Sequence, residues 1–215
     1  MSSKYFLNKT IIITGANQGI GLEIAKSFYA KGSNIILCAR NKKKLLSIKK
    51  KLVSKFKNKF FLEPLDISKK NQVDKFYKKI FKKNKKIDIL INNAGIALPT
   101  EINNSEFELF WDRTHNVLLK GQAILIKECL PFIEKSDTPR IVNISSTEGL
   151  GASPMHSPYT SAKHGVIGLT RSLAVELGKK DITVNCICPG PINTSMTKKI
   201  PEKDKDIYSK RRVPL

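Results

Sequence analysis

A tyrosine and a lysine four residues apart carry the clearest chemistry in this chain. They are Tyr159 and Lys163, and on a helix this spacing places both side chains on one face. A nearby ammonium stabilises a phenolate, so Lys163 should lower the pKa of Tyr159 by about two units from its usual value of about 10. The pair predicts a phenol that exchanges a proton with a bound molecule. Taken alone, it could equally be a surface pair.

A glycine-rich turn near the start of the chain predicts a phosphate-binding site. The run Thr14-Gly15-Ala16-Asn17-Gln18-Gly19-Ile20-Gly21 follows an apolar stretch and leads into residues with helical spacing. The missing Cβ atoms let the backbone approach a pyrophosphate closely, and free N–H groups at the start of a helix favour negative charge. For a glycine pattern alone, a tight turn without a ligand is the alternative.

The second apolar stretch indicates which dinucleotide fits. It ends in Cys38-Ala39-Arg40-Asn41, about twenty residues beyond the glycines, where an acid would bind the ribose 2′-hydroxyl of NAD. Ala39 stands at that point, and Arg40 can bind a 2′-phosphate in a charge-assisted pair. We therefore expect NADP(H) to be preferred, with NAD(H) possible. Arg40 could instead only cover a helix edge.

The elements that position these residues alternate along the chain. Six apolar, β-branched runs predict strands at Thr10–Thr14, Asn34–Ala39, Lys59–Leu65, Ile87–Ile91, Arg140–Ile144 and Ile182–Ile187. Amphipathic stretches between them predict helices at Gly19–Lys31, Asn41–Phe56, Asn71–Lys83, Asp112–Ile133 and Pro158–Gly178. Strands that are apolar on both faces belong in a parallel sheet between helix layers. The expected fold class is α/β, a three-layer doubly wound parallel sheet.

Length and composition favour one compact unit. The chain has 215 residues, of which 40% are hydrophobic, and we expect residues 1–215 to form a single dinucleotide-binding domain. The segment Met1–Lys9 lacks the apolar run of a leader peptide, and no stretch approaches the roughly 20 apolar residues that span a bilayer. The expectation is a cytoplasmic protein without a membrane partner.

A formal net charge of +21 raises nucleic-acid binding as a further hypothesis. The lysines cluster at 42–44, 49–51, 78–79 and 82–86, mostly on stretches with helical spacing, where they predict solvated outer faces. No stacking aromatics interleave with them, which makes a nucleic-acid partner the weakest of the readings.

The four cysteines predict no metal site. Cys38, Cys129, Cys186 and Cys188 are expected to be reduced core residues, the last two facing inward from a strand. A metal or redox pair at Cys186 and Cys188 is the competing interpretation, but one intervening residue is not the usual spacing of zinc or thioredoxin-like sites.

Taken together, these motifs resemble the short-chain dehydrogenase/reductase family from Lys9 to Leu215. The resemblance is carried by the glycine turn, by Asp66-Ile67, by Asn92-Asn93-Ala94-Gly95, by the Tyr159 and Lys163 pair, and by Pro189-Gly190 with Thr194. It implies a Rossmann fold, and the general look is similar to 3-oxoacyl-[acyl-carrier-protein] reductases. The implied reaction is hydride transfer between NADP(H) and a small-molecule carbonyl or alcohol.

The resemblance also implies roles for individual residues. Ser146, whose interval to Tyr159 matches that of the family's catalytic pair, would bind the substrate oxygen beside Tyr159 as acid/base and Lys163. Asp66 and Ile67 would flank the adenine, and Ile192 with Thr194 the nicotinamide carboxamide. The full set expected to bind cofactor is Gly15, Asn17, Gln18, Gly19, Ile20, Gly21, Arg40, Asn41, Asp66, Ile67, Asn93, Ala94, Gly95, Tyr159, Lys163, Pro189, Gly190, Ile192 and Thr194.

The chain departs from the family pattern in two places. Val117-Leu118-Leu119-Lys120-Gly121 carries leucine at position 118, where relatives usually have an asparagine that helps hold a water beside the lysine. The sequence also ends at Leu215, before the family's last helix and edge strand. A catalytically impaired nucleotide-binding or regulatory protein is therefore the alternative to an active enzyme. The resemblance further implies a homo-oligomer, a dimer or a tetramer.

Overall fold

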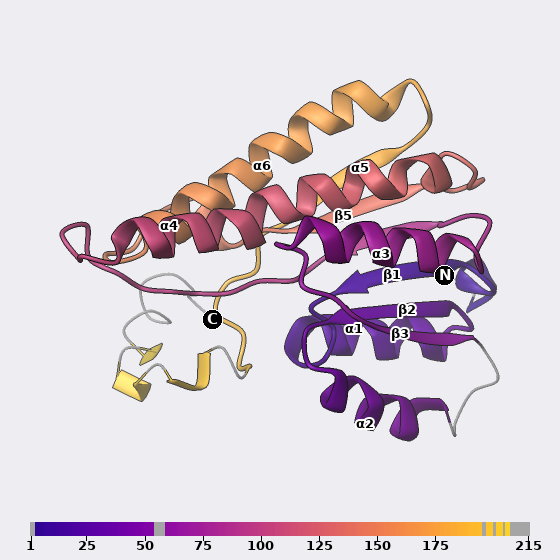
Figure 1. Cartoon of the computed structure of the whole chain (residues 1–215), viewed down its shortest axis with the longest axis horizontal. Helices are drawn as coiled ribbons and strands as arrows, with labels where there is room; N and C mark the ends of the chain where they lie inside the picture. Colours follow the sequence, from indigo (N-terminus) through magenta and orange to yellow (C-terminus); the bar gives the residue numbers. More distant parts are fainter. Residues whose placement is uncertain (1–2, 54–58, 195–196, 200, 204, 207–215) are drawn as a thin grey trace.

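The computed structural model describes residues 3–53, 59–194, 197–199, 201–203 and 205–206. Its centre is a parallel sheet of six strands in the order β3-β2-β1-β4-β5-β6 (Figure 1). The strands are β1 (Thr10–Thr14), β2 (Asn34–Ala39), β3 (Phe60–Pro64), β4 (Ile89–Asn92), β5 (Arg140–Ile144) and β6 (Thr183–Ile187). The order reverses between β1 and β4, and doubly wound sheets bind ligands at the carboxyl ends of the strands beside such a switch point.

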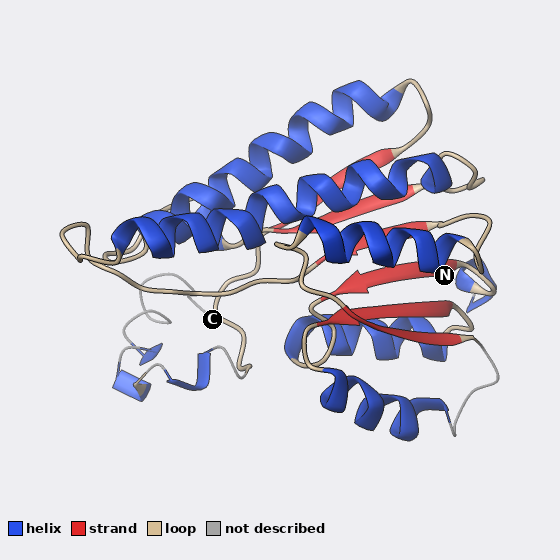
Figure 2. Cartoon of the chain, viewed as in Figure 1, coloured by secondary structure: helices blue, strands red, loops and turns tan. Residues whose placement is uncertain are grey.

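Helices cover both faces of the sheet (Figure 2). They are α1 (Gly19–Ala30), α2 (Lys42–Val53), α3 (Lys70–Phe81), α4 (Phe107–His115), α5 (Gly121–Ile133) and α6 (Ser157–Gly178), with a π-helical segment, η2 (Asn116–Lys120), between α4 and α5. Short 3-10 turns are η1 (Ser3–Phe6), η3 (Thr147–Gly149) and η4 (Thr197–Lys199). The chain is therefore the expected three-layer α/β structure.

Alternation along the strands divides the core into two clusters. Ile12, Ile36 and Leu90 face the layer of α3, α5 and α6, whereas Ile11, Ile35 and Ile89 face the layer of α1 and α2. Since successive strand residues point to opposite faces, a strand that is buried throughout, such as β1, supplies both layers. Burial on both faces holds the strand ends, and the loops that follow them, in fixed positions.

The sequence located the strands closely and the helices less closely. β1, β2 and β5 have the expected bounds, and the other three differ from them by one or two residues. The helix expected at Asp112–Ile133 begins earlier, at Phe107, and is interrupted by η2, where the Gly121 N–H reaches back five residues to the Asn116 carbonyl. Periodicity of 3.6 does not reveal a single wide turn. The expected end of α2 at Phe56 lies outside the described residues.

The expectation of four core cysteines was wrong for two of them. Cys38 and Cys129 are buried, but Cys186 and Cys188 are only partly buried, because β6 is the edge strand of the described sheet. All four thiols are free. Within the described residues, no group of three His, Cys, Asp or Glu side chains is placed to hold a metal ion, and none of the helices is long and apolar enough to cross a bilayer.

Candidate active site

The glycine-rich turn between β1 and α1 forms a cradle that side chains would fill. Gly15 and Gly19 have φ of 64° and 56°, a conformation that glycine adopts without strain. A Cβ on Gly15 would lie 2.7 Å from Ala94 Cα, and one on Gly21 would collide with the Asn93 side chain. The glycines thus let the turn pack closely against the segment after β4 and Thr194 while it leads into the N-terminus of α1, where backbone N–H groups favour a pyrophosphate. A dinucleotide fits these residues.

Thr14 ties this turn to the segment that follows β4. Its buried hydroxyl accepts hydrogen bonds from the backbone N–H groups of Asn93 and Ala94, both at 3.0 Å. The Asn93 side chain returns a bond to the Thr14 carbonyl, also at 3.0 Å. Thr14 was not among the residues expected at the site, although a hydroxyl at the end of a fully apolar strand was a signal for it. It fixes the two loops at the switch point together.

The end of β2 lies beside the glycine-rich turn, as a dinucleotide-binding site requires. Ala39 is buried, Arg40 and Asn41 are exposed, and the Ala16 N–H donates to the Cys38 carbonyl at 3.4 Å. The Asn41 side chain accepts from the Lys44 N–H at 2.9 Å and so begins α2. None of the residues from Cys38 to Asn41 is an acid, so this segment itself presents no like charge to a 2′-phosphate.

The loop after β3 supplies Asp66 and Ile67. The Asp66 carboxylate accepts from the N–H and hydroxyl of Ser68 at 3.0 and 2.6 Å, which holds the loop in a turn. Ile67 is buried, and its carbonyl would be 2.8 Å from a Cβ on Gly121. Gly121 therefore lets η2 and α5 pass close to the residue expected to flank the adenine.

Ser146 and Tyr159 meet at the carboxyl end of β5. Ser145 and Thr147 donate their N–H groups to the carbonyls of Ile187 and Pro189, which continues the β5–β6 pairing past the strands and holds Ser146 between two fixed residues. The side chains of Ser146 and Tyr159 lie close enough to interact, and the Ser146 hydroxyl acts to lower the pKa of Tyr159. The structure thus brings together the serine and the tyrosine that the sequence paired.

Lys163 lies one turn further along α6 and is almost fully buried. Its side-chain Nζ donates to the Ile144 carbonyl at 2.8 Å and lies 5.5 Å from the centre of the Tyr159 ring. Burial lowers the pKa of Lys163 to about 8, and the nearby Cys186 and Cys188 act in the opposite direction. Near neutral pH the ammonium is therefore easier to deprotonate than that of a surface lysine.

The pKa of Tyr159 shifts in the direction opposite to the one expected from Lys163. Burial raises this pKa, the hydrogen bond with Ser146 lowers it, and the Glu148 carboxylate raises it. The expectation of a lowered pKa was wrong because burial, the largest cause, raises the pKa of Tyr159. At neutral pH the phenol keeps its proton, which is the form that can protonate a substrate oxygen.

Leu118 fills the position where relatives usually have an asparagine. Its side chain is fully buried against the segment after β4, where its Cδ2 would be 3.5 Å from a Cβ on Gly95. Thr114 and Gln122, one turn to either side, are buried too and hold side-chain polar atoms without a hydrogen-bond partner. The helix therefore offers an apolar surface at position 118 itself.

The segment after β6 closes back over the glycine turn. Thr194 lies against Gly19, since its Cγ2 would be 3.2 Å from a Cβ there. The Thr194 N–H donates to the Thr197 hydroxyl at 2.9 Å, and that hydroxyl contacts the Ile192 carbonyl at 2.6 Å. Pro189, Gly190, Ile192 and Thr194 thus lie at the carboxyl edge of the sheet with the other expected cofactor residues.

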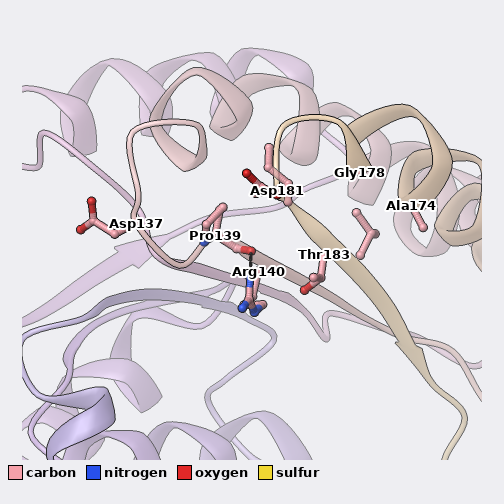
Figure 3. A pocket seen from close by; sticks show the side chains of 9 residues that line it. Asp137, Pro139, Arg140, Ala174, Gly178, Asp181 and Thr183 are labelled. Atoms are coloured by element: carbon pink, nitrogen blue, oxygen red, sulfur yellow. Dashed lines mark hydrogen bonds between the residues drawn. The ribbon is translucent and has the colours of Figure 1, made fainter.

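Described residues also line two hollows. One, of about 500 Å³, is at the opposite edge, where Pro139, Arg140 and Thr183 mark the amino ends of β5 and β6 (Figure 3). The other, of about 710 Å³, lies between the loops of Thr100 and Met155 and is lined by Thr160 and Ser161 of α6. Because doubly wound sheets bind ligands at their carboxyl edge, the first hollow is not the expected site.

The fold and these contacts define a class of protein: a dinucleotide-binding α/β oxidoreductase with a serine, tyrosine and lysine at the switch-point edge. The family model described as short chain dehydrogenase matches residues 9–205. The chain belongs to the short-chain dehydrogenase/reductase family, whose members are NAD(P)-dependent oxidoreductases.

Several named relatives are similar over nearly the whole chain. A 3-oxoacyl-[acyl-carrier-protein] reductase FabG from Rickettsia typhi is 34% identical over 98% of this chain and 83% of that protein. A D-beta-hydroxybutyrate dehydrogenase from Rhizobium meliloti is also 34% identical, over 92% of this chain and 77% of its own.

Solved structures show the same fold. A putative short-chain alcohol dehydrogenase from Sinorhizobium meliloti superposes with a TM-score of 0.85 at 27% identity, covering 95% of this chain and 80% of the other. Pseudomonas aeruginosa RhlG, in its NADP active-site complex, gives 0.87 at 24% identity, covering 98% and 83%.

Proposed function

We propose that this protein is an NADP(H)-dependent oxidoreductase that interconverts a carbonyl and an alcohol. The observation that carries the proposal is the convergence of the Ser146 and Tyr159 side chains, with Lys163 buried on the same helix as Tyr159. This trio lies at the carboxyl edge of the sheet, the edge that also holds the glycine turn. A phenol and a hydroxyl that converge there can both contact one oxygen of a bound substrate.

Each of the three side chains has a separate task. The cofactor, when bound, supplies the hydride. Ser146 donates a hydrogen bond to the substrate oxygen and stabilises the negative charge that develops there. Tyr159 gives its proton to that oxygen in reduction and takes it back in oxidation. Lys163 holds a positive charge beside the phenol ring and, by analogy with the family, binds the ribose next to the nicotinamide.

Two features support NADP(H) over NAD(H). Ala39 occupies the place where an acid would bind a free 2′-hydroxyl, and the exposed Arg40 follows it. The remaining cofactor contacts proposed are those of the glycine turn, Asn41, Asp66, Ile67 and residues 93–95, together with Pro189, Gly190, Ile192 and Thr194.

The names of the relatives suggest the substrate class. One acts on 3-oxoacyl groups of acyl-carrier protein and the other on beta-hydroxybutyrate, so both names describe a 3-oxo or 3-hydroxy acyl group. We propose that the substrate of this chain is a small molecule of that kind, with 3-oxoacyl thioesters as the first candidates.

The proposal predicts that Tyr159→Phe abolishes turnover while leaving NADPH binding mostly intact. The variant loses only the hydroxyl that donates the proton, so kcat should fall by at least about a hundredfold, the range of general acid catalysis. NADPH binding is measured by cofactor fluorescence, and turnover by the loss of its absorbance with a panel of ketones and 3-oxoacyl thioesters.

The same panel decides between the enzyme and its alternative. If wild type binds NADPH without converting any member, the impaired nucleotide-binding protein motivated by Leu118 is favoured, and Leu118→Asn should then be assayed for recovered turnover. If Tyr159→Phe turns substrate over as fast as wild type, the assignment of the proton donor is wrong. A wild type that binds neither NADPH nor NADH contradicts the proposal altogether.

We also propose that the chain forms a homo-oligomer through α4, α5 and α6. Leu109 and Trp111 on α4 and Val175 on α6 are exposed apolar side chains, and α4 packs beside α6 in one layer (Figure 1). Large apolar side chains that remain exposed on helices of one layer are typical of a subunit interface.

A further inference from the structure

A lysine of α2 reaches across to the glycine-rich turn. The Lys44 side-chain Nζ donates to the Gln18 side-chain oxygen at 3.1 Å, which joins the first turn of α2 to the residue directly before Gly19. The two residues are 26 positions apart in the chain. The contact therefore spans the carboxyl end of β2, between the cradle for the pyrophosphate and the strand end where the 2′-position of the ribose is expected.

The surrounding structure fixes the direction in which Lys44 extends. Its own N–H donates to the Asn41 side chain at 2.9 Å, and its neighbour Leu45 is almost fully buried in the core under α2. The Ala16 N–H, bonded to the Cys38 carbonyl, holds the turn beside the same strand end. Because both sides of the contact are anchored, Lys44 faces the space between α2 and the turn.

The charge at this place is unbalanced. Four of the five residues from Arg40 to Lys44 are cationic, and within the described part of the chain no ion pair joins any of them to an acid. The partner that Lys44 does have, the Gln18 amide, is neutral and cancels none of this charge. A phosphate placed between Arg40 and Lys44 would balance part of this positive charge and would form charge-assisted hydrogen bonds with both side chains.

We propose that Lys44 is the second cation of the 2′-phosphate site and, with Arg40, determines the preference for NADP(H). The inference rests on the proposed function, because it assigns a specificity-determining residue to that cofactor site. Lysine binds phosphate as a mobile point charge, whereas Arg40 offers a planar fork. In the free protein Gln18 holds Lys44 over the site, and the phosphate takes its place as the partner of the ammonium.

The test compares two neighbouring lysines in direct binding experiments. Lys44→Ala should raise the Kd for NADPH at least about tenfold, or roughly 1.4 kcal/mol, and change the Kd for NADH by less than about twofold. Lys43→Ala removes the same charge from the same exposed turn without a contact to Gln18, and should leave both constants within about twofold of wild type. Calorimetry with adenosine 2′,5′-bisphosphate and with 5′-AMP repeats the comparison without the nicotinamide.

The outcomes separate this inference from the function on which it rests. If wild type prefers NADPH and Lys44→Ala behaves like Lys43→Ala, the role of Lys44 is wrong and the proposed function stands. An equal loss of NADPH and NADH binding in Lys44→Ala would mean that the lysine only holds the turn, which also overturns the inference. A wild type that binds neither dinucleotide contradicts the proposed function itself.

Discussion

At the scale of single residues, the site combines a phenol that stays protonated with an ammonium that loses its proton more easily than that of a surface lysine. Burial raises the pKa of Tyr159 and lowers that of Lys163 to about 8, because a low-dielectric surrounding disfavours the charged form of each group. The two side chains therefore move toward a state in which both are neutral. Substrate reduction needs the protonated phenol, which this environment preserves.

The depressed pKa of Lys163 predicts a pH-dependent contribution to stability. Between about 8, its value in the fold, and 10.5, the ordinary value of a lysine, the unfolded chain binds more protons, so the free energy of unfolding rises with pH in this window. The Lys163→Met variant has no ammonium at this position and therefore lacks this pH-dependent contribution to the free energy of unfolding. The difference in unfolding free energy, wild type minus variant, should increase by about 2 kcal/mol from about pH 7 to about pH 10.

Urea titrations at several pH values measure this difference. Lys43→Met, which removes an exposed ammonium on α2, is the control and should give a difference that changes little over the same range. A flat difference for Lys163→Met would show that the Lys163 ammonium is not destabilised by burial.

At the scale of elements, the sequence predicted the sheet well and the connections less well. Strands such as β1 consist of consecutive β-branched residues, a pattern that depends on burial of both faces and is visible without neighbours. The π-helical segment η2 depends instead on what α4 and α5 pack against, and periodicity does not contain that information. The same reason explains the cysteines of β6, since burial at a sheet edge depends on whether another element covers it.

The site shows the same division. Tyr159, Lys163 and the glycines were predictable because their spacing along one helix or turn encodes their geometry. Thr14 and Lys44 were not, because their roles come from contacts with Asn93, Ala94 and Gln18, far away in the chain. The direction of the Tyr159 pKa shift also required the structure, since burial outweighs the effect of a charge whose orientation the sequence does not give.

A substitution at Gly121 measures how much the close contact between Gly121 and the Ile67 carbonyl constrains the fold. A Cβ at this position would lie 2.8 and 2.9 Å from the carbonyl oxygens of Ile67 and Asn116, and backbone atoms cannot move aside easily. Gly121→Ala should therefore lower the free energy of unfolding by about 1–3 kcal/mol, the usual cost of overpacking. Urea denaturation measures it, with NADPH affinity as a second readout because Ile67 is expected to flank the adenine.

Gly178→Ala is the matched control for this prediction. Gly178 ends α6, and nothing lies within 4 Å of an added Cβ, so the substitution should be neutral or stabilising by up to about 1 kcal/mol. Equal stabilities for the two alanine variants would contradict the tight contact between η2 and the loop after β3.

At the scale of the whole molecule, a large positive charge opposes the self-association that we propose. The excess of 39 lysines and arginines over 18 acids means that two copies repel each other at long range. The lysine-rich helix α2 lies at the β3 end of the sheet (Figure 1). The helices α4 and α6, which carry exposed apolar side chains, pack against each other, and α6 covers β6 at the opposite end. Apolar contact at this layer can therefore form while the more basic end points away.

This arrangement predicts a homodimer that salt strengthens and that a charge on α6 disrupts. Val175 is 82% exposed, so burying it between two copies would contribute about 1.5–3 kcal/mol, and Val175→Lys should shift the protein toward monomer. Leu46→Lys adds the same charge at a half-exposed leucine of α2 and should leave association nearly unchanged. Raising NaCl from about 0.05 to about 0.5 M shortens the screening length and should favour the dimer. Sedimentation velocity measures the association of wild type at both salt concentrations and of the two variants. A wild type that stays monomeric at high salt would contradict the homodimer. Equal effects of Val175→Lys and Leu46→Lys would mean that the interface does not include Val175.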